Sequence, residues 1–333
     1  IKLVMLALLI TLVIALFPYL TKIPEAAAIM PILIFVFAFD ALRELGSAVS
    51  RAMEKMEIEA VIQIFANFTI VVLGFVFLSL NPTSLSLAFA YAVGSGIGMV
   101  AIFVALNEHF RNLLGNFKTG LIWPIFKTAW PFGLMGIMGA VMLNTDIIML
   151  GWLRTAEEVG FYSAAQKPIQ LLYIIPTLLA TSIFPIIARL VRTDPKSAKK
   201  LLERYVALAM ILSIPATILG FVLAKPIIVT LFGSEYVAGI LTFQILLLTL
   251  PIVYPATILG NAIFAYDGQK FLALFASTAI IGNILFNFLL IPIFGIEGAA
   301  IATILTQLIT NFLIWRRIKS INGMSLLPIS TTL

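Results

Sequence analysis

The sequence has few of the residues that build soluble surfaces, metal sites or reactive thiols. Of its 333 residues only 11% are charged, one is histidine and none is cysteine. The lack of cysteine excludes disulfides, thiol catalysis and thiolate ligands, and His109 alone cannot build a zinc or haem site. A soluble domain carries about 25% charged residues, whereas this chain is 62% hydrophobic with a mean hydropathy of +1.12. We therefore expect an integral membrane protein with no bound metal and no cofactor.

Long apolar runs take the place of the missing charge. A membrane-spanning helix needs about 20 mostly apolar residues, and the runs here are too long and too little alternating for barrel strands. They predict an all-α, polytopic membrane helical bundle. Its ten predicted spans are residues 3–20, 26–45, 58–80, 85–106, 129–152, 159–188, 204–223, 238–264, 270–292 and 296–315.

The basic residues are distributed unevenly between the two sides that these spans define. Seventeen of the 21 Lys and Arg fall on one side, three on the other, and Lys167 lies inside a span. Cytoplasmic links carry the excess of basic residues, so we expect a multi-pass protein of the cell (plasma or inner) membrane with both chain ends cytoplasmic. The net charge of +6 then indicates orientation and contact with anionic membrane lipids, and no nucleic-acid partner.

The longest links suggest a division of the chain. We expect an N-terminal lobe at 1–106, a cytoplasmic interfacial linker at 107–128, a C-terminal lobe at 129–319 and a cytoplasmic tail at 320–333. Within the linker, apolar residues at helical spacing favour a helix lying in the membrane interface, and a plain polar linker is the alternative.

A weak internal repeat supports two related lobes. Gly46–Asn67 is echoed by Gly260–Asn283 at an offset of 214–216 residues. Duplicated bundles of this kind are common in transporters. The offset predicts two further spans before Ile1, which would make twelve spans in two pseudo-symmetric lobes.

Two charged residues lie well inside predicted spans, where charge is costly and is usually paired or faces a wet cavity. Asp146 and Lys167 each lie about ten residues from the turn between their spans, so both lie about 15 Å from that turn. Either they neutralise one another within the lobe, or they line a substrate cavity. The candidate cavity residues are Asp146, Lys167, Asn144, Gln166 and Gln170.

Other polar residues admit a structural and a functional interpretation. Asp40, one turn before Arg43, indicates interfacial snorkelling and capping, or a contact at a cytoplasmic gate. Uncharged amides such as Asn283, Asn287, Gln307 and Asn311 favour hydrogen bonds between helices. Pro168 and Pro176 predict a kink in the span 159–188.

The densest basic segment is residues 189–204, RLVRTDPKSAKKLLER. Such a segment is typical of a lipid-facing stretch that fixes orientation, and it could also meet a pyrophosphate headgroup at the cytoplasmic face. The candidate headgroup residues are Arg192, Lys196, Lys199 and Lys200.

Residues 128–190 carry a recognisable pattern. Its pieces are Trp130-Pro131, the intramembrane Asp146 followed by Leu150-Gly151, the turn 159–165, the basic Lys167, and Phe184-Pro185 before a basic link. The pattern resembles the second lobe of polysaccharide-biosynthesis flippases of the multidrug/oligosaccharidyl-lipid/polysaccharide (MOP) exporter superfamily. Residue 167 is often arginine in such proteins, and lysine keeps the charge but loses bidentate phosphate contact.

This resemblance implies a V-shaped pair of six-helix lobes that flips a polyprenyl-linked oligosaccharide to the outer leaflet by alternating access. It implies a monomeric transporter, not an enzyme, with the lipid-linked oligosaccharide, anionic lipids and polysaccharide-assembly membrane proteins as partners. A drug/cation antiporter of the same superfamily is the first alternative. A membrane glycosyltransferase or polymerase is the second, although the short outer links offer few acid/base residues.

Overall fold

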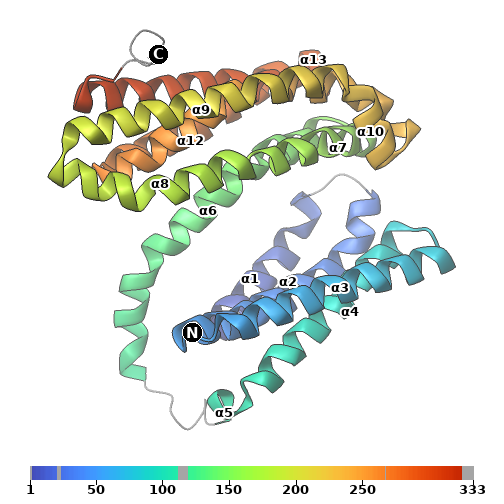
Figure 1. The fold of residues 1–333 in the computed structure, drawn as a ribbon. Coiled ribbons are helices and arrows are strands. Elements are labelled where there is room, and N and C mark those ends of the chain that lie inside the picture. Colours follow the sequence, from blue (N-terminus) through green and yellow to red (C-terminus); the bar gives the residue numbers. More distant parts are fainter. Residues whose placement is uncertain (1, 21–23, 112–118, 267, 325–333) are drawn as a thin grey trace. The chain divides into compact units, whose positions relative to one another are not determined.

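In the computed structural model, the described residues 2–20, 24–111, 119–266 and 268–324 are almost entirely helical and contain no strand (Figure 1). By their internal contacts they divide into two compact units, Ile1–Pro131 and Phe132–Leu333. The all-α prediction is confirmed. The finer boundaries at 107–128 and 320 stay predictions.

Several of these helices are long and apolar enough to cross a membrane. In the described part of the chain there are five, or six if the pair Ser234–Leu247 and Leu250–Ala265, bent by 47°, forms one span. Two of the five exceed a single span, since Ala156–Thr193 has 38 residues and Lys270–Asn322 has 53. The chain is therefore a multi-pass membrane protein, while the count of ten spans stays a prediction.

The first unit is a set of packed helices in which α4 lies against both α2 and α3. A Cβ atom added to Gly98 would lie 2.7 Å from Ala66 Cβ on α3, and one added to Gly94 would collide with Ile70. The glycines thus permit the close approach of α3 and α4. The helices are α1 (Lys2–Leu20), α2 (Pro24–Ala52), α3 (Met56–Leu80), α4 (Ser84–Ala105) and α5 (Asn107–Phe110).

The second unit is built around α12, which packs against α8, α9 and α13 (Figure 1). Its core includes the fully buried Tyr254, Leu247 and Leu259. The elements after α5 are η1 (Thr119–Leu121), α6 (Ile122–Leu153), α7 (Ala156–Leu172), α8 (Ile174–Thr193), α9 (Pro195–Val222), α10 (Ala224–Phe232), η2 (Ser234–Gly239), α11 (Ile240–Leu247), α12 (Leu250–Ala265) and α13 (Gln269–Asn322).

The last residues of the predicted linker 107–128 are helical, but they form the start of α6 and not a separate helix. The helix α6 begins at Ile122, seven residues before the predicted span start at 129. Pro124 does not prevent this, because proline is tolerated in the first turn of a helix. Residues 112–118, which hold most of the predicted interfacial helix, lie outside the described residues.

The kink predicted from Pro168 and Pro176 corresponds to a break at one residue, Tyr173, between α7, which ends at Leu172, and α8, which starts at Ile174. Pro176 has no N–H to donate to the Leu172 carbonyl four residues earlier. The Tyr254 hydroxyl of α12 donates to that carbonyl instead, at 2.9 Å. A buried core tyrosine therefore stabilises the break.

The element α13 consists of two antiparallel helices. The Arg317 guanidinium lies 3.6 Å from the centre of the Phe271 ring, whereas a straight helix would separate these residues by about 70 Å. The reversal occurs at Gly295, where φ is 61° and ψ is −133°, in the link expected between two predicted spans. Arg154 Nη2 donates to the Ile291 carbonyl at 2.7 Å and so ties α13 to the end of α6.

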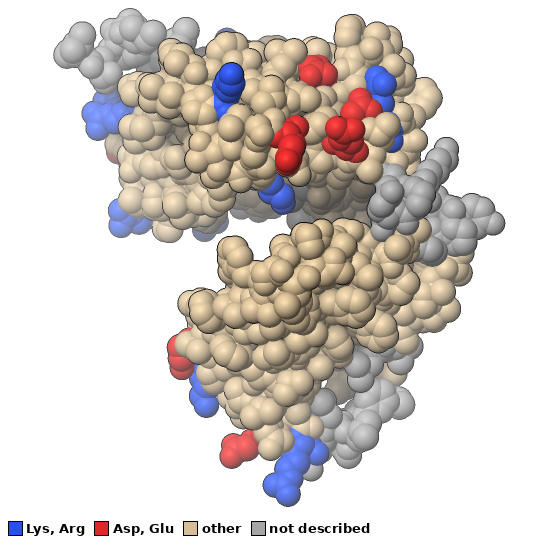
Figure 2. Space-filling view, turned by 90° about the vertical axis from the view of Figure 1, so that its right-hand side faces the viewer, with Lys and Arg blue, Asp and Glu red and all other residues tan. Residues whose placement is uncertain are grey.

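The basic segments of the second unit meet at one end of it. Lys199 Nζ, near the start of α9, donates to the Gly323 carbonyl at 2.8 Å, and Arg317 lies against Phe271. The α8–α9 link and both ends of α13 are therefore neighbours. Elsewhere charge is sparse, and most of the surface in Figure 2 carries neither acidic nor basic side chains.

Candidate functional site: a buried carboxylate beside a polar pocket

Asp146 on α6 is the centre of a buried hydrogen-bonded cluster, with only 8% of the residue exposed. Its carboxylate accepts four hydrogen bonds, and we call these five residues the Asp146 cluster. The donors are Tyr162 Oη at 2.7 Å, Asn283 Nδ2 at 2.9 Å, Asn287 Nδ2 at 2.6 Å and Thr303 Oγ1 at 2.7 Å.

The cluster explains how a carboxylate is kept inside a hydrophobic unit. A buried charge is costly unless it is paired or hydrogen-bonded, and an ionised carboxylate has about four acceptor positions. All four are filled by uncharged donors from α7 and from both helices of α13. A proton or a cation arriving at Asp146 must therefore displace a donor, and its arrival changes the contacts between α6, α7 and α13.

The chemistry of the cluster suits a proton or a hard cation better than a transition metal. Among the described residues, no three His, Cys, Asp or Glu side chains are placed so that they could hold a metal ion. Hard cations prefer carboxylate, amide and hydroxyl oxygens. In the arrangement observed, the amide nitrogens of Asn283 and Asn287 face the carboxylate, so a cation would have to displace them.

A pocket of about 340 Å³ adjoins the Asp146 cluster and lies wholly within the second unit. We call it the polar pocket. Its walls come mainly from α7, α12 and both helices of α13. Its polar lining residues are Asp146, Tyr162, Gln166, Gln170, Tyr173, Thr257, Asn283, Thr303, Thr306, Gln307, Thr310 and Asn311.

The structure brings together three of the five predicted cavity residues. Asp146, Gln166 and Gln170 all line the polar pocket, while a role in binding substrate stays a prediction. Asn144 is exposed, and its Nδ2 donates to the Ala140 carbonyl of its own helix at 2.9 Å. Lys167 is exposed and does not line the pocket.

The ion pair considered for Asp146 and Lys167 does not form. Neither residue belongs to any of the ion pairs found among the described residues. The reason is rotation around α7, although the two residues were expected at similar depth. Tyr162 faces Asp146, and Lys167 follows it by five residues, which turns the lysine about 140° away. The Asp146 carboxylate is stabilised by hydrogen bonds from uncharged side chains.

The residues that sequence reasoning missed are mostly hydroxyls. Tyr162 and Thr303 bond Asp146, while Thr306 and Thr310 line the pocket. A signal was present, because residues 303, 306, 307, 310 and 311 recur with the spacing of one helix face. It runs through an apolar segment, where single threonines attract little notice.

In the first unit, Asp40 and Arg43 form a contact between helices. Arg43 Nη2 donates to Asp40 Oδ1 at 2.9 Å and Nη1 donates to Gln63 of α3. Only 15% of the Arg43 side chain is exposed. The Arg43 guanidinium thus links Asp40 of α2 to Gln63 of α3, and both the snorkelling and the gate interpretation of Asp40 stay predictions.

The basic segment is largely available to solvent. Arg192, Lys196 and Lys200 are exposed, whereas Lys199 bonds the Gly323 carbonyl and approaches Glu203 at 3.9 Å. Asp194 caps the start of α9. Hydrogen bonds from the side chain and backbone of Ser197 lower the pKa of the Asp194 carboxyl. Of the four candidates, Lys199 is thus already engaged.

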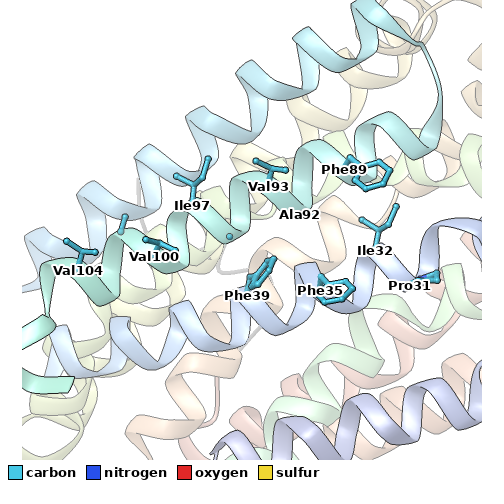
Figure 3. Close-up of a pocket in the computed structure, with 12 residues that line it drawn as sticks. Pro31, Ile32, Phe35, Phe39, Phe89, Ala92, Val93, Ile97, Val100 and Val104 are labelled. Atoms are coloured by element: carbon cyan, nitrogen blue, oxygen red, sulfur yellow. The ribbon is translucent and has the colours of Figure 1, made fainter. Parts of the chain in front are cut away.

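A second pocket, of about 730 Å³, lies between α2 and α4 in the first unit. Figure 3 shows its lining side chains, with Phe35 and Phe39 from α2 and Phe89, Val93 and Val100 from α4. Every lining side chain is apolar or glycine. The pocket suits a hydrocarbon chain and offers nothing to a sugar or a phosphate.

The fold is that of known exporters. The structure of "Lipid II flippase MurJ, inward closed conformation" matches with a TM-score of 0.76 at 17% identity, covering 96% of this chain and 69% of that one. An inward-facing multidrug resistance MATE family transporter of the MOP superfamily matches with a TM-score of 0.72 at 12% identity, covering 100% and 79%. The chain therefore shares the fold of these two proteins.

Sequence comparison gives the family. The model of the polysaccharide biosynthesis protein family matches residues 1–191, more than half of the chain, so the chain belongs to that family. A second model, MatE, matches residues 131–293. The "probable flippase AglR" of Haloferax volcanii is 32% identical over 173 residues, which are 50% of this chain and 36% of AglR. The matched part thus spans little more than a third of that relative.

Proposed function

We propose that the protein flips a polyprenyl-(pyro)phosphate-linked oligosaccharide from the cytoplasmic to the outer leaflet, by alternating access, for cell-surface polysaccharide synthesis. The observation that carries this proposal is the polar pocket, because amides and hydroxyls are costly inside a hydrophobic unit unless they are hydrogen-bonded within the protein or meet a polar ligand. Membership of the polysaccharide biosynthesis family supports it. So does the similarity to AglR, which is named as a flippase.

The two pockets match the two halves of such a substrate. The pocket between α2 and α4 has a wholly apolar lining, and the polar pocket has eleven uncharged polar side chains besides a single carboxylate. A lipid-linked sugar has a long hydrocarbon chain and a hydroxyl-rich head. One chain that offers sites of both kinds is suited to moving it.

The proposed architecture follows the predicted spans. Ten spans lie in two pseudo-symmetric lobes, 1–106 and 129–319, and the basic links face the cytoplasm of the cell membrane with both chain ends. The exposed Arg192, Lys196 and Lys200 contact anionic lipids and the arriving headgroup. The transporter works as a monomer, without enzymatic activity, alongside other polysaccharide-assembly membrane proteins.

Asp146 has the coupling role in this proposal. Its four donors come from α7 and from both helices of α13. Loading a proton or a cation displaces a donor, and the contacts among these helices then change. An ion that binds one arrangement of these helices more tightly than another shifts the equilibrium between them, and this is the coupling we propose.

The proposal is tested by measuring in which leaflet lipid-linked oligosaccharide accumulates when the gene is deleted. Intact cells and inverted membrane vesicles are treated with an impermeant sugar-modifying reagent. We expect accumulation at the cytoplasmic face, and normal glycan export after re-expression of the gene. Unchanged export in the deletion strain would contradict the proposal.

A drug/cation antiporter is the second candidate, and the MatE match to residues 131–293 favours it. The same deletion strain separates the two functions. An antiporter predicts normal glycan export with altered drug or dye resistance, whereas the flippase predicts the reverse.

A further inference from the structure

The polar pocket contains buried hydroxyls with no partner among the described residues. Thr306 and Thr310 are 7% and 8% exposed, one turn apart on α13, and both line the pocket. Neither Oγ1 atom makes a hydrogen bond, and Gln166 Oε1 on α7 is likewise buried without a partner. Such atoms in a native structure call for a ligand or an ordered water.

These threonines differ from others in the same chain. Threonine in a helix commonly donates to the carbonyl four residues earlier, and Thr217, Thr257 and Thr278 do so at 2.8 to 2.9 Å. Thr306 and Thr310 leave that bond unmade, so their hydroxyls remain available to whatever enters the pocket.

The charges around the pocket limit what can enter. Asp146 is the one charged residue among those that line it, and no Lys, Arg or His does so. Phosphate and carboxylate groups are recognised through cations such as arginine. An anionic group would here find no cation and would face the Asp146 carboxylate.

The remaining wall is apolar, with Ile169, Ile280 and Ile314 among its residues. A sugar ring has the same mixed character, with hydroxyls at its edge and C–H groups on its faces. The volume of about 340 Å³ falls in the range of small-molecule pockets and far exceeds the roughly 30 Å³ of one water.

We propose that the polar pocket binds an uncharged sugar of the lipid-linked substrate, through the Thr306 and Thr310 hydroxyls and the Gln166 amide, and excludes sugars that carry carboxylate or phosphate. This inference rests on the proposed function and specifies its substrate class. The pyrophosphate of the carrier is then held outside the pocket.

The test compares two polyprenyl-pyrophosphate-linked disaccharides in proteoliposomes, one of N-acetylglucosamine and glucose, the other with glucuronate in place of glucose. Impermeant periodate detects the sugars that reach the outer leaflet. We expect the wild-type protein to move the neutral substrate at least about tenfold faster. Each lost hydrogen bond to the sugar should raise the half-saturating substrate concentration about three- to tenfold in Thr306→Val and Thr310→Val.

Two matched variants control for folding. Thr278→Val removes a hydroxyl that bonds its own helix and should transport normally. Thr306→Ser and Thr310→Ser keep the hydroxyl and should transport the neutral substrate as the wild type does. Unchanged transport by the double valine variant would mean that the pocket holds only water and would overturn the inference. Equal rates for both disaccharides would overturn the charge exclusion. If the wild type moves neither disaccharide, the proposed function itself fails.

Discussion

At the scale of single residues, Asp146 shows how an isolated charge is kept in a hydrophobic interior by neutral donors alone. The four bonds to its carboxylate come from residues 16 to 157 positions away in the chain. The carboxylate thus links three segments of the second unit, and its replacement should affect both stability and transport.

Asp146→Asn should lower the free energy of unfolding by about 1–3 kcal/mol, because its amide N–H groups would face donors that then lack an acceptor. Lys167→Gln should change it by less than about 0.5 kcal/mol, since that lysine is exposed. The change in the free energy of unfolding of the double variant should equal the sum of the two single changes within about 0.5 kcal/mol. Equilibrium unfolding in mixed micelles measures all three.

The same double-mutant cycle tests whether Asp146 and Lys167, which were expected at similar depth, interact. Partial rescue of Asp146→Asn by Lys167→Gln would mean that the two residues interact, and it would contradict the observed cluster.

The sequence was sufficient to single out Asp146, Gln166 and Gln170, because polar residues in apolar runs are conspicuous. It was not sufficient to name their partners. Depth along a helix follows from counting residues, whereas the direction of a side chain depends on helix rotation, so counting could not decide whether Asp146 and Lys167 form an ion pair. Asn287 lies before the reversal of α13 and Thr303 after it, and the reversal lets both bond Asp146, which is more than 130 positions earlier in the chain.

At the scale of elements, two interruptions shape the second unit. Proline removes a backbone donor at α7–α8, and a left-handed glycine reverses α13. In each case a side chain from another helix bonds a nearby carbonyl, Tyr254 in the first and Arg154 in the second.

Tyr254→Phe tests the first of these contacts. It removes the hydroxyl that bonds the Leu172 carbonyl and leaves a polar group at the α7–α8 break without a partner, at a cost of about 1–3 kcal/mol. Thermal unfolding in detergent measures the loss. Tyr91→Phe is the matched control, because Tyr91 is exposed on α4, and an equal loss in both variants would contradict the account.

Most helices could be predicted from apolar run length, including two spans where the structure has the two helices of α13. Proline also indicated the α7–α8 interruption. The extension of α6 back to Ile122 could not be predicted in the same way, because Pro124 and Lys127 interrupt the apolar pattern while a proline in the first turn leaves the helix intact.

At the scale of the whole molecule, the few charged residues and the two pockets have distinct places in the two units. The basic segments of the second unit meet at one end of it. Asp146 is the one charged residue that lines the polar pocket. A wholly apolar pocket lies in the other unit. This division of polar and apolar sites is the basis for our proposal that the protein carries lipid-linked sugars.

The most direct test of that claim is translocation by the purified protein in proteoliposomes that hold a polyprenyl-pyrophosphate-linked neutral oligosaccharide. In protein-free vesicles, impermeant periodate should oxidise only the sugars of the outer leaflet. With the protein present, the account predicts that nearly all of the oligosaccharide becomes oxidised, and that Asp146→Asn slows this process. Oxidation that stops at the level of protein-free vesicles would contradict the account.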